Sequence, residues 1–150
     1  MTKEEIKDFS YRISQCSKTE LVVITYDIIL NYLNSAKESL QENEMANFHF
    51  NIKKAKQFVN DLSSNLDFKY NMSCDLMSLY LYINRTLLSA SVRKSEEHID
   101  VCIRIINELR NAFDKISPED KRGMAMPRGE QVFAGLTYGR TSRLNEVYMR

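Results

Sequence analysis

All four glycines and both prolines of this 150-residue chain lie after residue 117. Glycine adopts positive φ without strain and proline fixes φ, so these two residues mark most tight turns. A β-rich fold needs such turns every few residues, and the first 117 residues contain neither residue type. The distribution predicts an all-α body over residues 1–117, followed by a C-terminal extension over residues 118–150 that is built differently.

Four stretches of the body carry apolar residues at steps of three and four, which is the spacing of one helix face. These stripes run over residues 21–40, 48–66, 72–90 and 99–116. Ser17 and Glu20 have the capping-box spacing ahead of the first stripe, and Ser95 has the place of an N-cap ahead of the fourth. The same capping-box spacing in Thr2 and Glu5 predicts a short helix at the N-terminus.

The breaks between the stripes are too short for the chain to cross the length of a bundle. Successive helices must therefore lie antiparallel to one another. The predicted fold is an antiparallel up-down four-helix bundle with a short N-terminal helix and a tail that contains all the glycine and proline.

Several of the predicted helices carry more apolar residues than the three in seven that a bundle core requires. This surplus has two explanations. It either forms a wide core edge that the tail or the N-terminal segment covers, or it forms a groove for the amphipathic helix of a partner. The residues alone leave both explanations open.

The composition excludes several function classes. A net charge of +1 argues against nucleic-acid binding, and no apolar run approaches the ~20 residues of a membrane span. Three widely spaced cysteines predict no disulfide framework and fit a cytoplasmic protein, with Cys74 and Cys102 expected to pack in or beside the core. Because His49 and His98 belong to no Glu-x-x-His pair, we expect no metal. The body also has no glycine-rich phosphate loop, so we expect no cofactor and no catalytic residue.

Five short segments occur in a set order along the body. They comprise residues 20–27, 52–56, 64–67, 79–90 and 108–113. In this order they resemble the flagellar export chaperone family FliS, and residues 79–90 match its L-Y-x-Y-(M/I)-x-x-x-L-x-x-A pattern most specifically. Residues 52–56 resemble the family's L-x-K-A-x pattern, whereas Phe113 replaces a tryptophan and Thr25 replaces an apolar residue.

The resemblance implies a cytoplasmic chaperone, not an enzyme, that binds the C-terminal amphipathic segment of flagellin. Such a chaperone prevents premature polymerisation and hands flagellin to components of the flagellar export apparatus. A segment that folds on binding needs a long apolar surface, which the surplus apolar residues could supply. The candidates for this surface are Leu21, Ile24, Tyr26, Ile28, Tyr80, Tyr82, Ile83 and Leu87. Ordinary core packing is the alternative for each of them.

The C-terminal extension is apolar enough to pack against a protein surface. Its alternation of Val132, Ala134, Leu136 and Tyr138 predicts an extended segment. We expect the extension to pack on the bundle or on a neighbouring protomer, with a homodimer left open. Val132, Phe133, Leu136 and Tyr138 are the candidates for covering part of the flagellin groove. A segment that covers an edge without function is the alternative.

Two other functions remain at this point. One is a helical-bundle adaptor or regulator of another secretion component, and the other, ranked last, is a metal-binding bundle enzyme. No nucleic-acid partner and no membrane insertion are expected.

Overall fold

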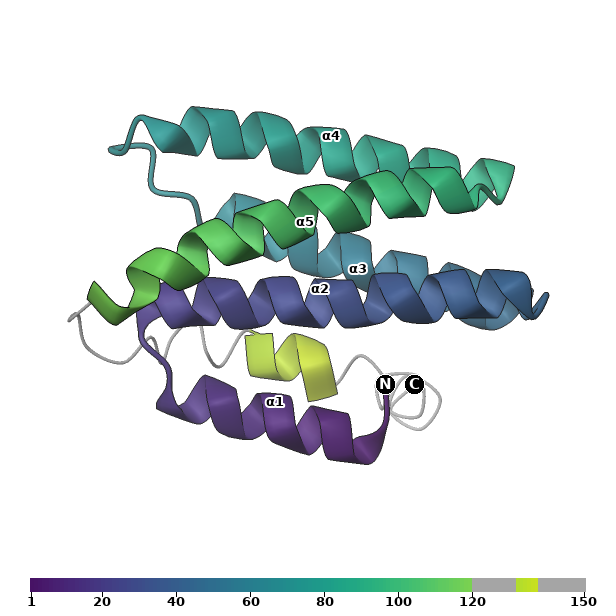
Figure 1. Cartoon of the computed structure of the whole chain (residues 1–150), viewed down its shortest axis with the longest axis horizontal. Helices are drawn as coiled ribbons and strands as arrows, with labels where there is room; N and C mark the ends of the chain where they lie inside the picture. Colours follow the sequence, from purple (N-terminus) through teal and green to yellow (C-terminus); the bar gives the residue numbers. More distant parts are fainter. Residues whose placement is uncertain (120–131, 138–150) are drawn as a thin grey trace, which may run out of the picture.

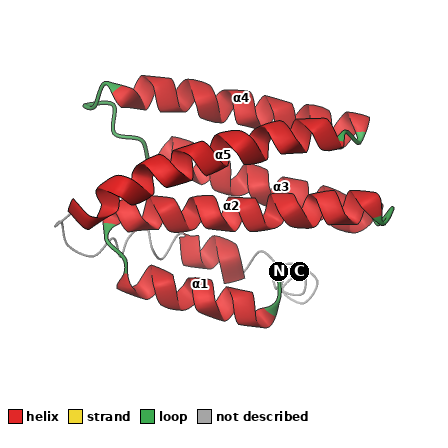
Figure 2. Cartoon of the chain, viewed as in Figure 1, coloured by secondary structure: helices red, strands yellow, loops and turns green. Residues whose placement is uncertain are grey.

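The computed structural model of the chain describes residues 1–119 and 132–137. Its elements are α1 (Lys3–Gln15), α2 (Lys18–Gln41), α3 (Met45–Ser64), α4 (Met72–Arg93), α5 (Glu96–Ile116) and the 3₁₀ turn η1 (Ser117–Glu119). A further short helix spans residues 132–137 and is called the tail helix below. Within the described part of the chain, Figure 2 shows helices and loops only, which confirms the predicted all-α class.

The four long helices form the predicted antiparallel bundle. Helix α2 packs against α3 and α5, and α4 packs against the same two helices from the other side (Figure 1). Helix α1 runs back along the outside of α2, and the tail helix lies between α1 and the bundle in this view (Figure 1). None of the described helices combines the length and apolar character needed to cross a membrane.

The predicted helix starts are confirmed in atomic detail. Thr2 and Glu5 form a complete capping box, in which each side chain bonds to the backbone N–H of the other residue. Ser17 accepts a hydrogen bond from the N–H of Glu20, and Ser95 caps α5 in the same way. These caps satisfy backbone donors that have no partner inside the helix.

Two connections between the long helices use left-handed backbone in place of glycine. Asn43 follows α2 with φ of 59°, and Lys94 follows α4 with φ of 52°. The N–H groups of Lys94 and Ser95 both reach the carbonyl of Ala90, which closes the end of α4. Because the body contains no glycine, an asparagine and a lysine adopt the left-handed conformation at these two connections. Asparagine tolerates this conformation, whereas lysine adopts it at a cost in free energy.

Two expectations about individual segments are wrong. Residues 132–137 are helical and not extended, because Val132 and Leu136 stand four residues apart and bury together on one helix face. Cys74 is exposed rather than packed beside the core, whereas Cys16 and Cys102 are buried. Burial raises the pKa of the Cys102 thiol to about 12, so this thiol is held in its protonated, unreactive form.

Candidate partner-binding site

The predicted partner-binding residues lie mostly in the core. Seven of the eight are between 0% and 4% exposed: Leu21, Ile24, Tyr26, Ile28, Tyr80, Ile83 and Leu87. Tyr82 is 45% exposed on α4 and helps to line a cavity of about 520 Å³ between α4 and α5. In the described structure, only Tyr82 of this set therefore offers a broad surface to a partner.

Two of the buried residues join motifs that are far apart in the sequence. The hydroxyl oxygens of Tyr26 and Tyr80 lie 2.5 Å apart, which links α2 to α4 through the core. The Tyr26 ring also packs against Phe113 of α5, with ring centroids 5.8 Å apart. Because a buried hydroxyl requires a partner, this pairing explains how two tyrosines fit in an apolar core.

The buried state of Ile24 and Ile28 is explained by α1. Asp27 and Asn31 share a face of α2 with these two isoleucines by helical spacing, and both bond to side chains of α1. That face of α2 therefore lies beneath α1, whose Phe9 and Ile13 belong to the same core cluster. Part of the surplus apolar surface of α2 is a core edge covered by the N-terminal helix.

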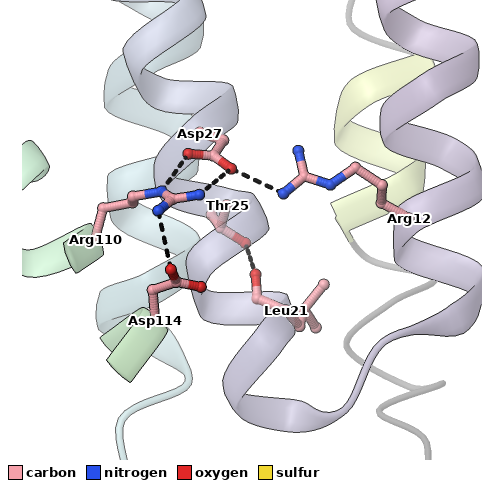
Figure 3. A network of polar contacts seen from close by, with 6 residues as sticks. All are labelled: Arg12, Leu21, Thr25, Asp27, Arg110 and Asp114. Carbon is pink, nitrogen blue, oxygen red and sulfur yellow. Dashed lines mark hydrogen bonds and ion pairs between the residues drawn. The ribbon is translucent and has the colours of Figure 1, made fainter. Parts of the chain in front are cut away.

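Asp27 holds three helices together in the network drawn in Figure 3. Arg12 of α1 donates to Asp27 Oδ2 at 2.8 Å, and Arg110 Nε of α5 donates to Asp27 Oδ1 at 2.9 Å. Arg110 also pairs with Asp114 one turn further along α5. The hydrogen bond to Asp27 raises the pKa of Arg110. Asp27 is thus a structural hub between α1, α2 and α5.

Thr25 shows why a polar residue is accepted where the family pattern has an apolar one. Its hydroxyl donates to the carbonyl of Leu21 at 2.7 Å, so the buried Oγ1 needs no partner from another helix (Figure 3).

A second surface lies where α2 and α3 meet beside α1. Its floor consists of Tyr32 of α2, which stacks on Phe58 of α3 with ring centroids 5.9 Å apart, and of Lys54. The Lys54 ammonium lies 5.9 Å from the Tyr32 ring centroid and 5.4 Å from that of Phe58. We call the surface formed by Tyr32, Lys54 and Phe58 the α2/α3 groove.

The tail helix is seated in this groove. Val132 and Leu136 are 3% and 0% exposed and belong to the same core cluster as α1, α2 and α3. Phe133 is 43% exposed and faces away from the groove, and Tyr138 lies outside the described residues. Of the three tail candidates that the structure describes, Val132 and Leu136 are the two that are buried against the body.

A cavity of about 420 Å³ extends the groove toward the start of α1. Its lining combines residues of the N-terminus, α1, α2 and α3: Met1, Ile6, Tyr32, Ser39, Asn47, Phe50 and Asn51. Tyr32 belongs to both the groove floor and this cavity, so the two surfaces adjoin at its ring. Another cavity, of about 370 Å³, lies at the opposite end of α2 and includes Tyr80 and Phe113 in its lining.

Lys54 is the functional candidate that the apolar patterns missed. It is only 3% exposed, and burial lowers the pKa of its ammonium because desolvation disfavours the charge. A charged residue is expected on a solvated face, so hydrophobic periodicity could not have selected it. The signal that could have done so is the L-x-K-A-x pattern, in which Lys54 is the lysine.

Parts of the described surface remain open and apolar. The outer face of α4 exposes Leu81, Leu88 and Val92 alongside Tyr82. The surplus apolar residues thus divide into two groups. On α2, Ile24 and Ile28 are buried, whereas on α4 Leu81, Tyr82, Leu88 and Val92 are exposed within residues 1–119 and 132–137. Over the same residues, no three His, Cys, Asp or Glu side chains are placed to share a metal ion.

Comparisons with known proteins point to one family. The sequence model of a family described as flagellar protein FliS matches residues 3–120, which include all five α-helices of the body. The flagellar secretion chaperone FliS of Bacillus subtilis (strain 168) is 17% identical over 110 residues, covering 73% of this chain and 83% of that protein.

Proposed function

Because this chain belongs to the flagellar protein FliS family, we propose that it is a flagellar secretion chaperone that binds the C-terminal segment of flagellin in the cytoplasm. In this proposal the chaperone masks the segment, prevents premature polymerisation and delivers flagellin to the export apparatus. The action is stoichiometric and involves no catalytic step. The observation that supports it most is the family match over residues 3–120, which leaves no helix of the bundle outside the match.

The physical requirement for this function is a surface that accepts an amphipathic helix. A disordered segment loses conformational entropy when it folds on a partner, so the partner must bury a large apolar area to offset that cost. Two surfaces of the body are candidates for this role: the α2/α3 groove with its adjoining cavity, and the exposed face of α4 around Tyr82. The first is the better candidate because a helix of this chain is already seated there.

Co-purification with flagellin of the same organism tests the proposal. Tagged full-length chain should retain flagellin and should fail to retain a flagellin that lacks its C-terminal amphipathic segment. A flagellin lacking an equally long piece of its central region is the matched control and should be retained. Failure to retain any form would overturn the proposed function, and equal retention of all forms would overturn its mechanism.

A further inference from the structure

We propose that the tail helix competes with the partner for the α2/α3 groove. It occupies the groove until a helix of the partner with the same spacing of apolar residues displaces it. This inference rests on the proposed function. It adds that flagellin binds in the α2/α3 groove and that the tail helix controls this binding. The displacing helix belongs to the C-terminal segment of flagellin. It carries two apolar residues four positions apart, with a small residue directly before the second.

The first argument is the way in which the tail helix is anchored. Val132 and Leu136 are buried, while Phe133 between them in sequence is 43% exposed. This is the pattern of an amphipathic helix lying in an apolar groove, with anchors one turn apart. The structure therefore displays the kind of ligand that the groove accepts.

The second argument is a close approach that favours a small residue. A Cβ atom placed on Gly135 would lie 3.3 Å from both Cε1 and Cζ of Phe58, closer than ordinary van der Waals contact. The helix backbone thus rests almost directly on the Phe58 ring. Glycine at the equivalent position of a competing helix allows this approach without a shift of the Phe58 ring, whereas a larger residue would displace the ring by a few tenths of an ångström.

The third argument is the hydrogen bond made by Lys54. Its ammonium donates to the carbonyl of Gly135 at 2.7 Å. That carbonyl belongs to the last turn of the tail helix, where carbonyls have no partner inside the helix and the helix dipole attracts a cation. The buried lysine is therefore placed to receive the C-terminal end of a helix, and residues 132–137 themselves carry no charged side chain.

The fourth argument concerns how firmly the tail helix is held. Six residues span only about 9 Å of helix, and helices this short have little stability of their own in water. Tyr32 of the groove floor also lines the cavity of about 420 Å³, which lies next to the groove. A longer amphipathic helix that reached this cavity would also bury its apolar lining residues Met1, Ile6 and Phe50, which would strengthen its binding.

Two single substitutions in the full chain test the inference. Leu136→Asp introduces a charge on the buried face and should release the tail helix, whereas Phe133→Asp introduces the same charge on the exposed face of the same helix. Binding of a labelled flagellin C-terminal segment is measured by fluorescence anisotropy. We expect Leu136→Asp to bind about tenfold more tightly than the unaltered chain. This is the change expected if the groove is open in about one tenth of the unaltered molecules and in nearly all molecules of the variant. Phe133→Asp should bind as the unaltered chain does.

The outcomes separate this inference from the function on which it rests. If no form binds the segment, the proposed function fails. If all forms bind with equal affinity, or Leu136→Asp binds more weakly, the function stands and the competition is overturned.

A second measurement needs no substitution and so does not depend on how the variants fold. Hydrogen exchange of amides 132–137 in the unaltered chain should become faster when the flagellin segment is added, because the tail helix leaves the groove. Unchanged or slower exchange while the segment is bound would show that the two helices do not compete.

Discussion

At the scale of single residues, a few polar side chains decide how the apolar surfaces are covered. Asp27 of α2 forms ion pairs with Arg12 and Arg110. Glu5 of α1 accepts hydrogen bonds from the N–H of Thr2 and from the side chain of Asn31. These contacts fix α1 over the face of α2 that carries Ile24 and Ile28. Two residues proposed for partner binding are therefore core residues for as long as α1 is docked.

Glu5 should make the stability of the chain depend on acid pH. The backbone hydrogen bond from Thr2 lowers the pKa of Glu5 below its usual 4.5, helped by the side chain of Asn31. A carboxylate with a lowered folded pKa contributes stability above its unfolded pKa and loses that contribution as the pH falls through the folded value. At neutral pH, Glu5→Gln should lower the free energy of unfolding by about 0.5 kcal/mol, a small effect because solvent screens this carboxylate.

Urea unfolding of Glu5→Gln and of the unaltered chain, repeated from neutral pH downward, measures this difference. The two unfolding curves should converge in acid, where Glu5 is protonated in both states. Glu4→Gln removes the same charge from the same helix turn at an exposed position and should have a smaller effect. Equal effects of the two substitutions at every pH would contradict the role given to Glu5.

At the scale of elements, helix α4 ends at a residue other than glycine that adopts left-handed backbone. Lys94 adopts φ of 52° and ψ of 48° at the end of α4, a conformation that costs an ordinary side chain about 1 kcal/mol. The tight connection to the Ser95 cap of α5 compels this conformation.

Replacing Lys94 by glycine should therefore stabilise the bundle. We expect Lys94→Gly to raise the free energy of unfolding by about 0.5–1 kcal/mol, because glycine adopts left-handed backbone without strain. The neighbouring Arg93→Gly, inside the last turn of α4, should lower it by a similar amount. Thermal unfolding followed by circular dichroism measures both, and a loss of stability in Lys94→Gly would contradict the account of this turn.

The helices of the body could be predicted because periodicity and caps agree along each of them. The tail helix could not, since Val132 and Leu136 fit the two-residue period of a strand as well as the turn of a helix. Only the groove beneath them selects the helix. The partner-binding residues posed a similar problem: a second apolar stripe has the same sequence pattern whether it is covered or open. Ile24 and Ile28 proved covered and Tyr82 open, a distinction that depends on where α1 and α4 lie.

At the scale of the whole molecule, the chain is a five-helix body that carries a short helix from its own C-terminal extension. The body is the part that matches the FliS family, and the tail helix, at residues 132–137, lies beyond the matched residues 3–120. The α2/α3 groove joins the two parts through Lys54 and Phe58. The surface proposed to bind flagellin is thus also the surface that the extension contacts.

A calorimetric titration of the full chain with the isolated C-terminal segment of flagellin, at several temperatures, tests the central claim most directly. The account predicts one-to-one binding with a negative heat-capacity change. Its size should correspond to the burial of roughly 1,000 Å² of surface or more as the segment folds on the bundle. The absence of binding, or binding without a heat-capacity change, would contradict it.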